Sequence, residues 1–193
     1  MQLQAILLVS SVLLWIFLFL NLLLTLALVR RYNRISTPRL ETSEQGLRAG
    51  TKGPDFKAFT LDGASVSLAD YSGTGRANLF IFSAPGCQPC HDLLATLKPL
   101  QPQIKQSETD LIIVSDGRVE QTRAWAQEME IPFTIISAPR LSNPFFQDYK
   151  VHMTPSYCLL NSQSVVESAG LSDGYNPRWT ALISSWSKLS SPA

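Results

Sequence analysis

The sequence Gly-Cys-Gln-Pro-Cys-His at 86–91 follows a short apolar run, and this combination constrains the fold more than any other feature of the chain. The run ANLFIF at 77–82 is bounded by turn-forming residues, which is typical of a buried strand. A strand that ends just before Cys-x-x-Cys places Cys87 at the start of a helix, where the positive end of the helix dipole favours a thiolate. Cys90 is then one helical turn away, so the two sulfurs are able to form a disulfide.

The same residues also fit a second chemistry, because Cys-x-x-Cys-His is the attachment motif of c-type haem. In that interpretation Cys87 and Cys90 form thioethers to the porphyrin. His91 is then one axial iron ligand, and Met129 or Met153 is the other. A c-type cytochrome requires neither a buried strand before the motif nor a Thr-Pro pair after it. The sequence therefore favours the redox pair and keeps the membrane-anchored cytochrome as the alternative.

The rest of this region alternates predicted strands and helices. Strands are expected at 110–116, 133–137, 156–161 and 164–170, with a weaker strand or turn at 64–71. Helices are expected over 87–103 with a break near Pro99, over 119–130 and over 176–189, and a short helix is expected to start at Asn143 with Pro144 at its first position. This order predicts an α/β domain in which helices flank a central mixed sheet.

An uncharged apolar segment at 5–29 precedes the domain. At ~1.5 Å per residue a helix of this length reaches about 37 Å, enough to cross a ~30 Å hydrocarbon core. A cleaved signal peptide has a basic start and a shorter apolar run, whereas this chain starts with MQLQ. The sequence therefore predicts an uncleaved transmembrane anchor at 5–29 in contact with membrane lipid, a polar linker at 30–52 and a folded domain at 53–190.

The distribution of charge bears on two further properties, nucleic-acid binding and orientation in the membrane. The chain has 16 Lys and Arg against 15 Asp and Glu, a formal net charge of +1, which gives no basic surface for nucleic acid. By the positive-inside rule, basic residues that follow an anchor place the domain in the cytoplasm. Basic residues directly follow segment 5–29 and none precedes it; they include Arg30, Arg31, Arg34 and Arg39.

Three stretches together resemble the redoxin branch of the thioredoxin superfamily. They are KGPDFKAFTLDGASVSLADYSG at 52–73, ANLFIFSAPGCQPC at 77–90 and MTPSYCLLN at 153–161. The chain is similar in particular to membrane-anchored, TlpA-type thiol–disulfide oxidoreductases, and most to the methylamine dehydrogenase accessory type. The resemblance implies a thioredoxin-like fold, no cofactor and no metal. Its implied partners are a client protein that contains cysteines and a second protein that restores the redox state.

The resemblance also implies roles for four residues. Cys87 is expected to attack and Cys90 to resolve the mixed disulfide, as the helix dipole argument also indicates. Thr154 and Pro155 are expected to position the client, with Pro155 where this fold places a cis-proline. Relatives of this type keep the domain outside the cytoplasm, against the orientation given by the arginines. We predict a single-pass membrane protein whose domain is extracytoplasmic.

The sequence departs from the family at two places. Many relatives carry a buried acid near the second cysteine, but 77–82 contains none and Leu93 occupies the position three residues after Cys90. The peroxidatic pattern Pro-x-x-x-Thr-x-x-Cys is also missing, because Phe80 and Ala84 occupy its Pro and Thr positions. These departures favour thiol exchange with a protein over peroxide reduction, and leave a non-catalytic client-binding module as a further alternative.

The sequence also predicts the surroundings of three other side chains. His91 is expected on the helix surface, four residues from Cys87, from where it can tune the thiolate. Asp92 is expected to be a solvated acid in the first turn. Cys158 lies on an apolar strand and is expected to be buried, with a regulatory or client-bridging thiol as the alternative.

Overall fold

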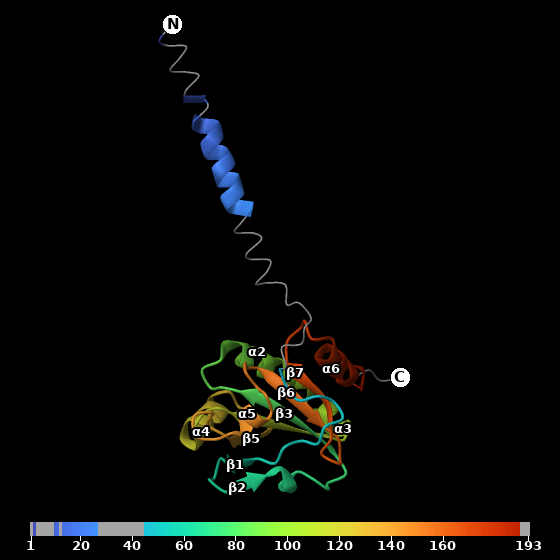
Figure 1. Ribbon diagram of the computed structural model, residues 1–193. Coiled ribbons are helices and arrows are strands. Elements are labelled where there is room, and N and C mark those ends of the chain that lie inside the picture. Colours follow the sequence, from blue (N-terminus) through green and yellow to red (C-terminus); the bar gives the residue numbers. More distant parts are fainter. Residues whose placement is uncertain (1, 3–9, 12, 27–44, 190–193) are drawn as a thin grey trace. The chain divides into compact units, whose positions relative to one another are not determined.

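The computed structural model describes residues 2, 10–11, 13–26 and 45–189 (Figure 1). The chain divides into two units, Met1–Ser43 and Glu44–Ala193, and residues 13–26 of the first are helical. None of the helices in the described ranges combines the length and the apolar character that a membrane crossing requires. Both ends of the expected anchor at 5–29 and linker residues 30–44 lie outside the described residues.

A seven-stranded sheet in the order β2-β1-β5-β4-β3-β6-β7 is the centre of the second unit. Its strands β3, β4 and β5 are parallel, whereas the β1–β2 and β6–β7 hairpins pair antiparallel to their neighbours. The predicted mixed sheet is confirmed. The strands are β1 Lys57–Thr60, β2 Ser65–Ser67, β3 Ala77–Ser83, β4 Thr109–Ser115, β5 Thr134–Ser137, β6 Ser156–Leu160 and β7 Val166–Leu171.

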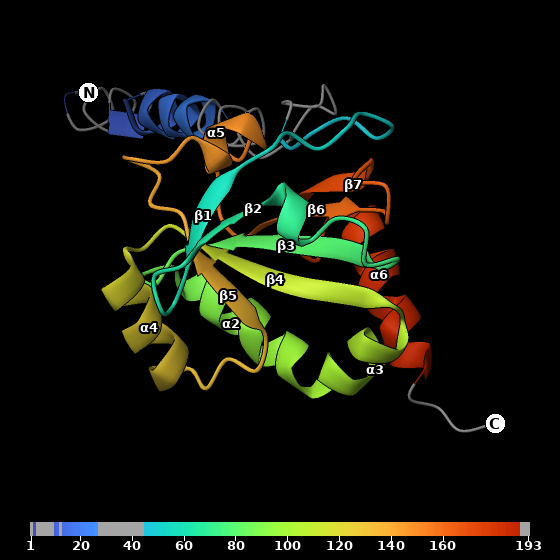
Figure 2. The ribbon, with the colours of Figure 1, turned by 90° about the horizontal axis from the view of Figure 1, so that it is seen from below.

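Helices cover both faces of the sheet, as Figure 2 shows from below. The α-helices are α2 Gln88–Leu97, α3 Gln101–Gln106, α4 Val119–Glu128, α5 Phe145–Asp148 and α6 Pro177–Leu189, and short 3-10 turns lie at η1 Leu68–Asp70 and η2 Lys98–Leu100. Side chains of α2, α3, α4 and α6 pack on one face, and those of α5 pack on the other. The predicted break near Pro99 is the η2 turn between α2 and α3.

Alternate side chains of β3 enter two separate cores. Leu79 and Ile81 pack with the helices of the first face, whereas Phe80 and Phe82 enter an aromatic cluster on the second. In that cluster the rings of Phe80 and Phe82 meet Phe145 edge-on, with centroids 5.9 and 5.3 Å apart. Because both faces of β3 are buried, the strand is a firm support for the loop that follows it.

Two elements differ from the predicted ones. β1 was not predicted, because in KAFT only Ala58 is buried and the strand is defined by its pairing with β2 and β5. The helix predicted to start with Pro144 at its first position starts one residue later, with Pro144 as its N-cap. The side chain of Asn143 still contributes there, because its Oδ1 accepts from the Phe145 N–H at 3.0 Å.

Residues 45–52, which the sequence assigned to the linker, are bonded to the folded unit. The N–H of Gly46 donates to the Lys150 carbonyl at 3.0 Å, and that of Gly50 to the Val166 carbonyl at 2.8 Å. Lys52 forms an isolated bridge with Val165. The packed part of the chain thus includes residues before Gly53.

Candidate active site

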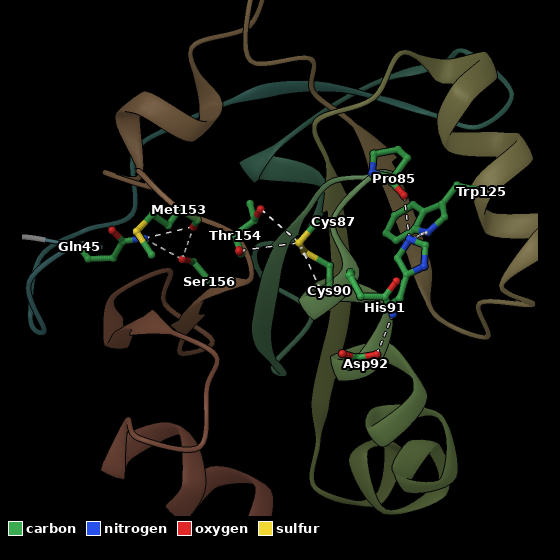
Figure 3. Close-up of a disulfide and its surroundings, with 11 residues drawn as sticks. Gln45, Pro85, Cys87, Cys90, His91, Asp92, Trp125, Met153, Thr154 and Ser156 are labelled. Atoms are coloured by element: carbon green, nitrogen blue, oxygen red, sulfur yellow. Dashed lines mark hydrogen bonds between the residues drawn. A yellow bond between two sulfur atoms is a disulfide. The ribbon is translucent and has the colours of Figure 1, made fainter. Parts of the chain in front are cut away.

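Cys87 and Cys90 form a disulfide just beyond the carboxyl end of β3 (Figure 3). The S–S distance is 2.10 Å and the Cα atoms are 5.2 Å apart. Cys87 is the N-cap of α2, and its Sγ accepts from the backbone N–H of Cys90 at 3.3 Å. The first cysteine therefore lies where the helix N-terminus presents a backbone donor and the positive end of its dipole.

The two sulfurs differ in accessibility. Cys87 is half-buried, whereas Cys90 has no exposed surface. In the sequence Pro89 lies between the two cysteines. It is exposed in the first turn of α2, where a residue without an N–H loses no helical hydrogen bond. An incoming thiolate or disulfide therefore meets Cys87 first, and Cys90 is left to act from inside the protein.

Thr154 and Pro155 lie against the pair. Their peptide bond is cis, as expected for this position. The Thr154 hydroxyl donates to Cys87 Sγ at 3.6 Å, and the Thr154 carbonyl oxygen lies 3.8 Å from the same sulfur. Thr154 and Pro155 are both half-buried, so part of each faces solvent beside Cys87. The structure thus brings the four predicted site residues to one place.

The loop before β6 is held by bonds on both sides, and Figure 3 shows those made by Gln45 and Ser156. The Gln45 side-chain amide donates to the Met153 carbonyl at 3.2 Å and to Ser156 Oγ at 2.9 Å, and Ser156 Oγ donates to the Met153 carbonyl at 2.6 Å. On the other side the Ser172 N–H donates to the Pro155 carbonyl at 3.1 Å. Sequence reasoning missed Gln45, because it lies in a polar stretch with no periodic pattern.

His91 is not on the open surface of α2, so that expectation was wrong. It is half-buried between the loop at 84–87 and α4, with Nε2 2.7 Å from the Pro85 carbonyl and 3.1 Å from Trp125 Nε1. The two rings stack with centroids 5.9 Å apart. His91 Nε2 is therefore within hydrogen-bond distance of two protein groups, and the two sulfurs are bonded to each other. This arrangement favours a redox pair over a haem attachment site.

Acidic groups near the pair lie at the surface. Asp92 is exposed, as expected, and its Oδ1 accepts from the Gln88 side chain at 3.0 Å. Among the buried side chains of residues 45–188 there is no carboxylate, so the acid that many relatives carry has no substitute in that set. Buried hydroxyls are present instead, and Ser83, Ser115 and Ser137 lie in register at the ends of β3, β4 and β5.

Cys158 is buried, as expected. It lies on β6, has 1% of its surface exposed, and burial raises the pKa of its thiol to about 12. Its side chain packs in the core that contains Phe80 and Phe82, on the face of the sheet opposite α2. Cys158 is therefore separated by the sheet from the side on which α2 and the buried Cys90 lie.

Solved structures that resemble this one include proteins described as thiol-disulfide oxidoreductases and interchange proteins. The thioredoxin domain of a thiol-disulfide oxidoreductase from Bacteroides vulgatus superposes with a TM-score of 0.58 at 19% identity, covering 70% of this chain and 96% of that chain. A thiol:disulfide interchange protein from Bacteroides sp. gives a TM-score of 0.59 at 21% identity, covering 76% and 93%. These similarities establish the thioredoxin-like fold.

Sequence comparison finds methylamine utilization proteins. MauD of Methylobacillus flagellatus is 26% identical over 175 residues, which cover 87% of this chain and 81% of that protein. MauD of Paracoccus denitrificans is 24% identical over 171 residues, covering 86% and 82%. Residues 49–169, which include the redox pair and the cis-proline, match the family model of AhpC/TSA. The chain therefore belongs to the AhpC/TSA family.

Proposed function

We propose that this protein exchanges disulfides with cysteines of a client protein during the client's maturation. The observation that carries the proposal is the difference between the two sulfurs. Cys87 is half-buried at the N-cap of α2 and in contact with Thr154, whereas Cys90 is fully buried. The arrangement gives one sulfur to attack or be attacked and a second to act within the molecule.

The chemistry balances in both directions without a cofactor. In oxidation, a client thiolate attacks Cys87 Sγ, the Cys87–Cys90 bond breaks, and Cys90 leaves with the electron pair. A second client thiolate then attacks the client sulfur of the mixed disulfide and releases Cys87, so that two electrons end on this protein. In reduction, the Cys87 thiolate attacks a client disulfide and Cys90 resolves the product. A separate redox partner protein restores the starting state.

The groups around Cys87 support its role in both directions. The Cys90 N–H and the Thr154 hydroxyl both donate to Cys87 Sγ, and such bonds strengthen when the acceptor carries negative charge. The loop with Thr154 and Pro155 runs beside this sulfur and is fixed by Gln45 and Ser172. We propose that an extended client segment lies along this loop while its cysteine reacts.

Peroxide reduction is not part of the proposal. Phe80 occupies the position of the peroxidatic proline and is fully buried in the aromatic core, and Ala84 stands where that chemistry uses a threonine hydroxyl. Neither side chain has a polar group with which to orient a peroxide.

The relatives suggest a client class and a location. The MauD proteins are methylamine utilization proteins, and we propose that the client here is an enzyme of the methylamine dehydrogenase kind. We propose further that residues 5–29 anchor the chain by a single pass in the membrane lipid and that the domain is extracytoplasmic. Disulfides persist in that compartment, which supports this side of the membrane despite the arginines that follow the apolar segment.

Trapping of the mixed disulfide tests the proposal. Cys90→Ser should accumulate a covalent adduct between Cys87 and the client, visible on a non-reducing gel and lost on reduction, while Cys87→Ser accumulates none. The opposite pattern would reverse the two roles. If the wild type binds the client yet fails to exchange with a small disulfide, the non-catalytic module is the better description. A haem band in a pyridine haemochrome spectrum would favour the cytochrome.

A further inference from the structure

An apolar groove of about 510 Å³ runs between α2 and α6, and its lining includes Pro89, a sequence neighbour of Cys90. Its end at the active site is formed by Pro89, which separates the two cysteines, and by the cis-proline Pro155. From there it continues along α2 past Asp92 and Thr96, which lie on one face of the helix with Pro89. Through Pro89 and Pro155, one end of the groove therefore lies beside the site at which Cys87 reacts.

The floor of the groove is apolar and firm. Leu93 of α2 and Trp179 of α6 are 9% and 4% exposed, and both belong to the core on this side of the sheet. Ile183 is half-buried beside them. Pockets of roughly 300–1,000 Å³ bury most of a small organic ligand, so this groove has room for a large side chain and its neighbours.

The charges at the groove have one sign. Asp92 and Asp173 are its charged lining residues, and no lysine or arginine of residues 45–189 lines it. Arg178 precedes Trp179 in α6 but is not part of the lining. Asp173 Oδ1 already accepts from the N–H groups of Tyr175 and Asn176, so its position is fixed by the start of α6.

Two exposed apolar side chains stand on the loops at the active-site end. Met153, next to Thr154, is 58% exposed, and Tyr175, next to the lining residue Gly174, is 96% exposed. Methionine and tyrosine are enriched in protein interfaces, whereas a fully exposed tyrosine gains nothing from packing within its own chain. Both therefore fit a surface that contacts another protein.

We propose that this groove selects clients by the residues close to their reactive cysteine, an inference that rests on the function proposed above. A selected client has a large aliphatic or aromatic residue and a lysine or arginine shortly before or after that cysteine. The apolar side chain enters the groove over Leu93 and Trp179, and the basic group pairs with Asp92 and Asp173. The client's backbone passes Pro155 while its sulfur meets Cys87. Selection in this form depends on local sequence around the cysteine and needs no folded client.

Peptide disulfides test the groove with the full chain in detergent. The reduced Cys90→Ser protein is mixed with short cysteine peptides whose sulfur carries 2-nitro-5-thiobenzoate. Cys87 attacks the peptide sulfur, the S–S bond breaks, and the coloured nitrothiobenzoate leaves with the electron pair. Three peptides carry Leu and Lys, Leu and Glu, or Ser and Ser beside the cysteine. Each rate is divided by the same protein's rate with the symmetrical nitrothiobenzoate disulfide, which carries no peptide side chain.

We expect the Leu-Lys peptide to react about tenfold faster than the Ser-Ser peptide, the scale on which burial of one apolar side chain discriminates between substrates. Thr96→Arg places a bulky cation in the groove and should abolish this preference. Ala95→Arg is the matched control, because Ala95 is the neighbour of Thr96 on α2, is also exposed and does not line the groove. Asp92→Asn should reduce the advantage of Leu-Lys over Leu-Glu and keep that of Leu over Ser.

Different failures have different meanings. Equal normalised rates for all three peptides, or a preference that survives Thr96→Arg, would overturn the groove while leaving disulfide exchange intact. Absence of reaction with the symmetrical disulfide would instead remove the proposed function. A wild-type dimer that Thr96→Arg converts to a monomer would assign the groove to a second copy of the chain and also overturn the proposal.

Discussion

His91 Nε2 lies 2.7 Å from the carbonyl oxygen of Pro85, two residues before Cys87. The indole N–H of Trp125 points to the same nitrogen at 3.1 Å, but one neutral ring nitrogen is unable to donate and accept at once. The shorter distance decides between them, because two lone pairs repel at 2.7 Å. Nε2 thus carries the proton and donates to Pro85, so the ring ties the loop before Cys87 to α2.

We predict from this that His91 occupies the Nε2–H tautomer, which ¹⁵N chemical shifts of the imidazole report. Trp125→Phe should leave the tautomer unchanged, because the Pro85 carbonyl and not the indole determines it. His91→Phe should lower the free energy of unfolding by about 1–3 kcal/mol, the cost of a half-buried carbonyl without its donor. A shift of the tautomer in Trp125→Phe would mean that the indole is the true partner.

Thr154 is predicted to hold Cys87 in its reactive form. In a Cys90→Ser background, Thr154→Val should slow alkylation of Cys87 by iodoacetamide at neutral pH about threefold to tenfold, since one hydrogen bond to the thiolate is lost. Thr154→Ser keeps the hydroxyl and should restore the rate. At pH well above 10, where cysteines are ionised in any case, all three rates should converge; a persistent difference there would indicate blocked access instead.

Stability should fall at alkaline pH, in part through Cys158. Its folded pKa is about 12 against a reference value of 9.0. Between these values the unfolded thiol loses its proton and the folded thiol keeps it, so stability is full below about pH 9 and falls as pH rises. Burial also raises the pKa of Tyr71, Tyr149 and Tyr157, which act in the same direction at higher pH.

Urea unfolding at pH 8 and pH 11 measures the share of Cys158. Cys158→Ala should lose about 1–3 kcal/mol less than the wild type between the two values, following ~1.4 kcal/mol per pKa unit. Equal losses in both proteins would show that this thiol ionises without unfolding. Thiol exchange at pH 7 should be unaffected by the substitution, because the sheet separates Cys158 from α2.

Two serines in the row at the ends of the parallel strands should respond oppositely to alanine. Ser83 Oγ is buried without a hydrogen-bond partner among the described residues, so Ser83→Ala should leave stability unchanged or raise it by up to about 1 kcal/mol. Ser137 Oγ donates to the Gly117 carbonyl at 2.7 Å, and Ser137→Ala should cost about 1 kcal/mol. Thermal unfolding of the two variants checks the sign; a loss in Ser83→Ala would indicate that its hydroxyl has a partner in solution.

Sidedness is testable in cells. We expect a membrane-impermeant maleimide, added to intact cells after mild reduction, to label Cys87, because the domain is proposed to lie outside the cytoplasm. Cys87→Ser is the control for specificity, and a cytoplasmic thiol protein is the control for intact membranes. Labelling that occurs only after lysis would place the domain inside, as the arginines at 30–39 indicate.

Much of the sheet was predictable because its strands are buried on both sides. The run at 77–82 lies within β3, 110–116 covers β4 except for its first residue, and 133–137 contains β5, since continuous apolar runs bounded by polar residues have few other solutions. β1 was not predictable in this way. Its four residues alternate weakly, and only its partner strands determine that KAFT is extended.

The candidate site was likewise predictable only in part. Cys87 and Cys90 follow from the Cys-x-x-Cys spacing, whereas Thr154 and Pro155 follow from the family resemblance; the structure places Thr154 in contact with Cys87. The contacts of His91 and Gln45 did not follow, because they depend on α4 and on the loop before β6, which are distant in sequence. Long-range side-chain contacts of this kind leave no local pattern.

The contact of Gln45 with Met153 ties residues 45–50, at the start of the folded unit, to the loop along which we propose that the client lies. A chain segment that only joined two units could change freely in length and composition, but this one carries a side chain that fixes the loop beside the redox pair. Evolution is therefore expected to change residues 45–50 and 153–156 together. Exchanging residues 45–50 between two homologues would then alter the choice of client.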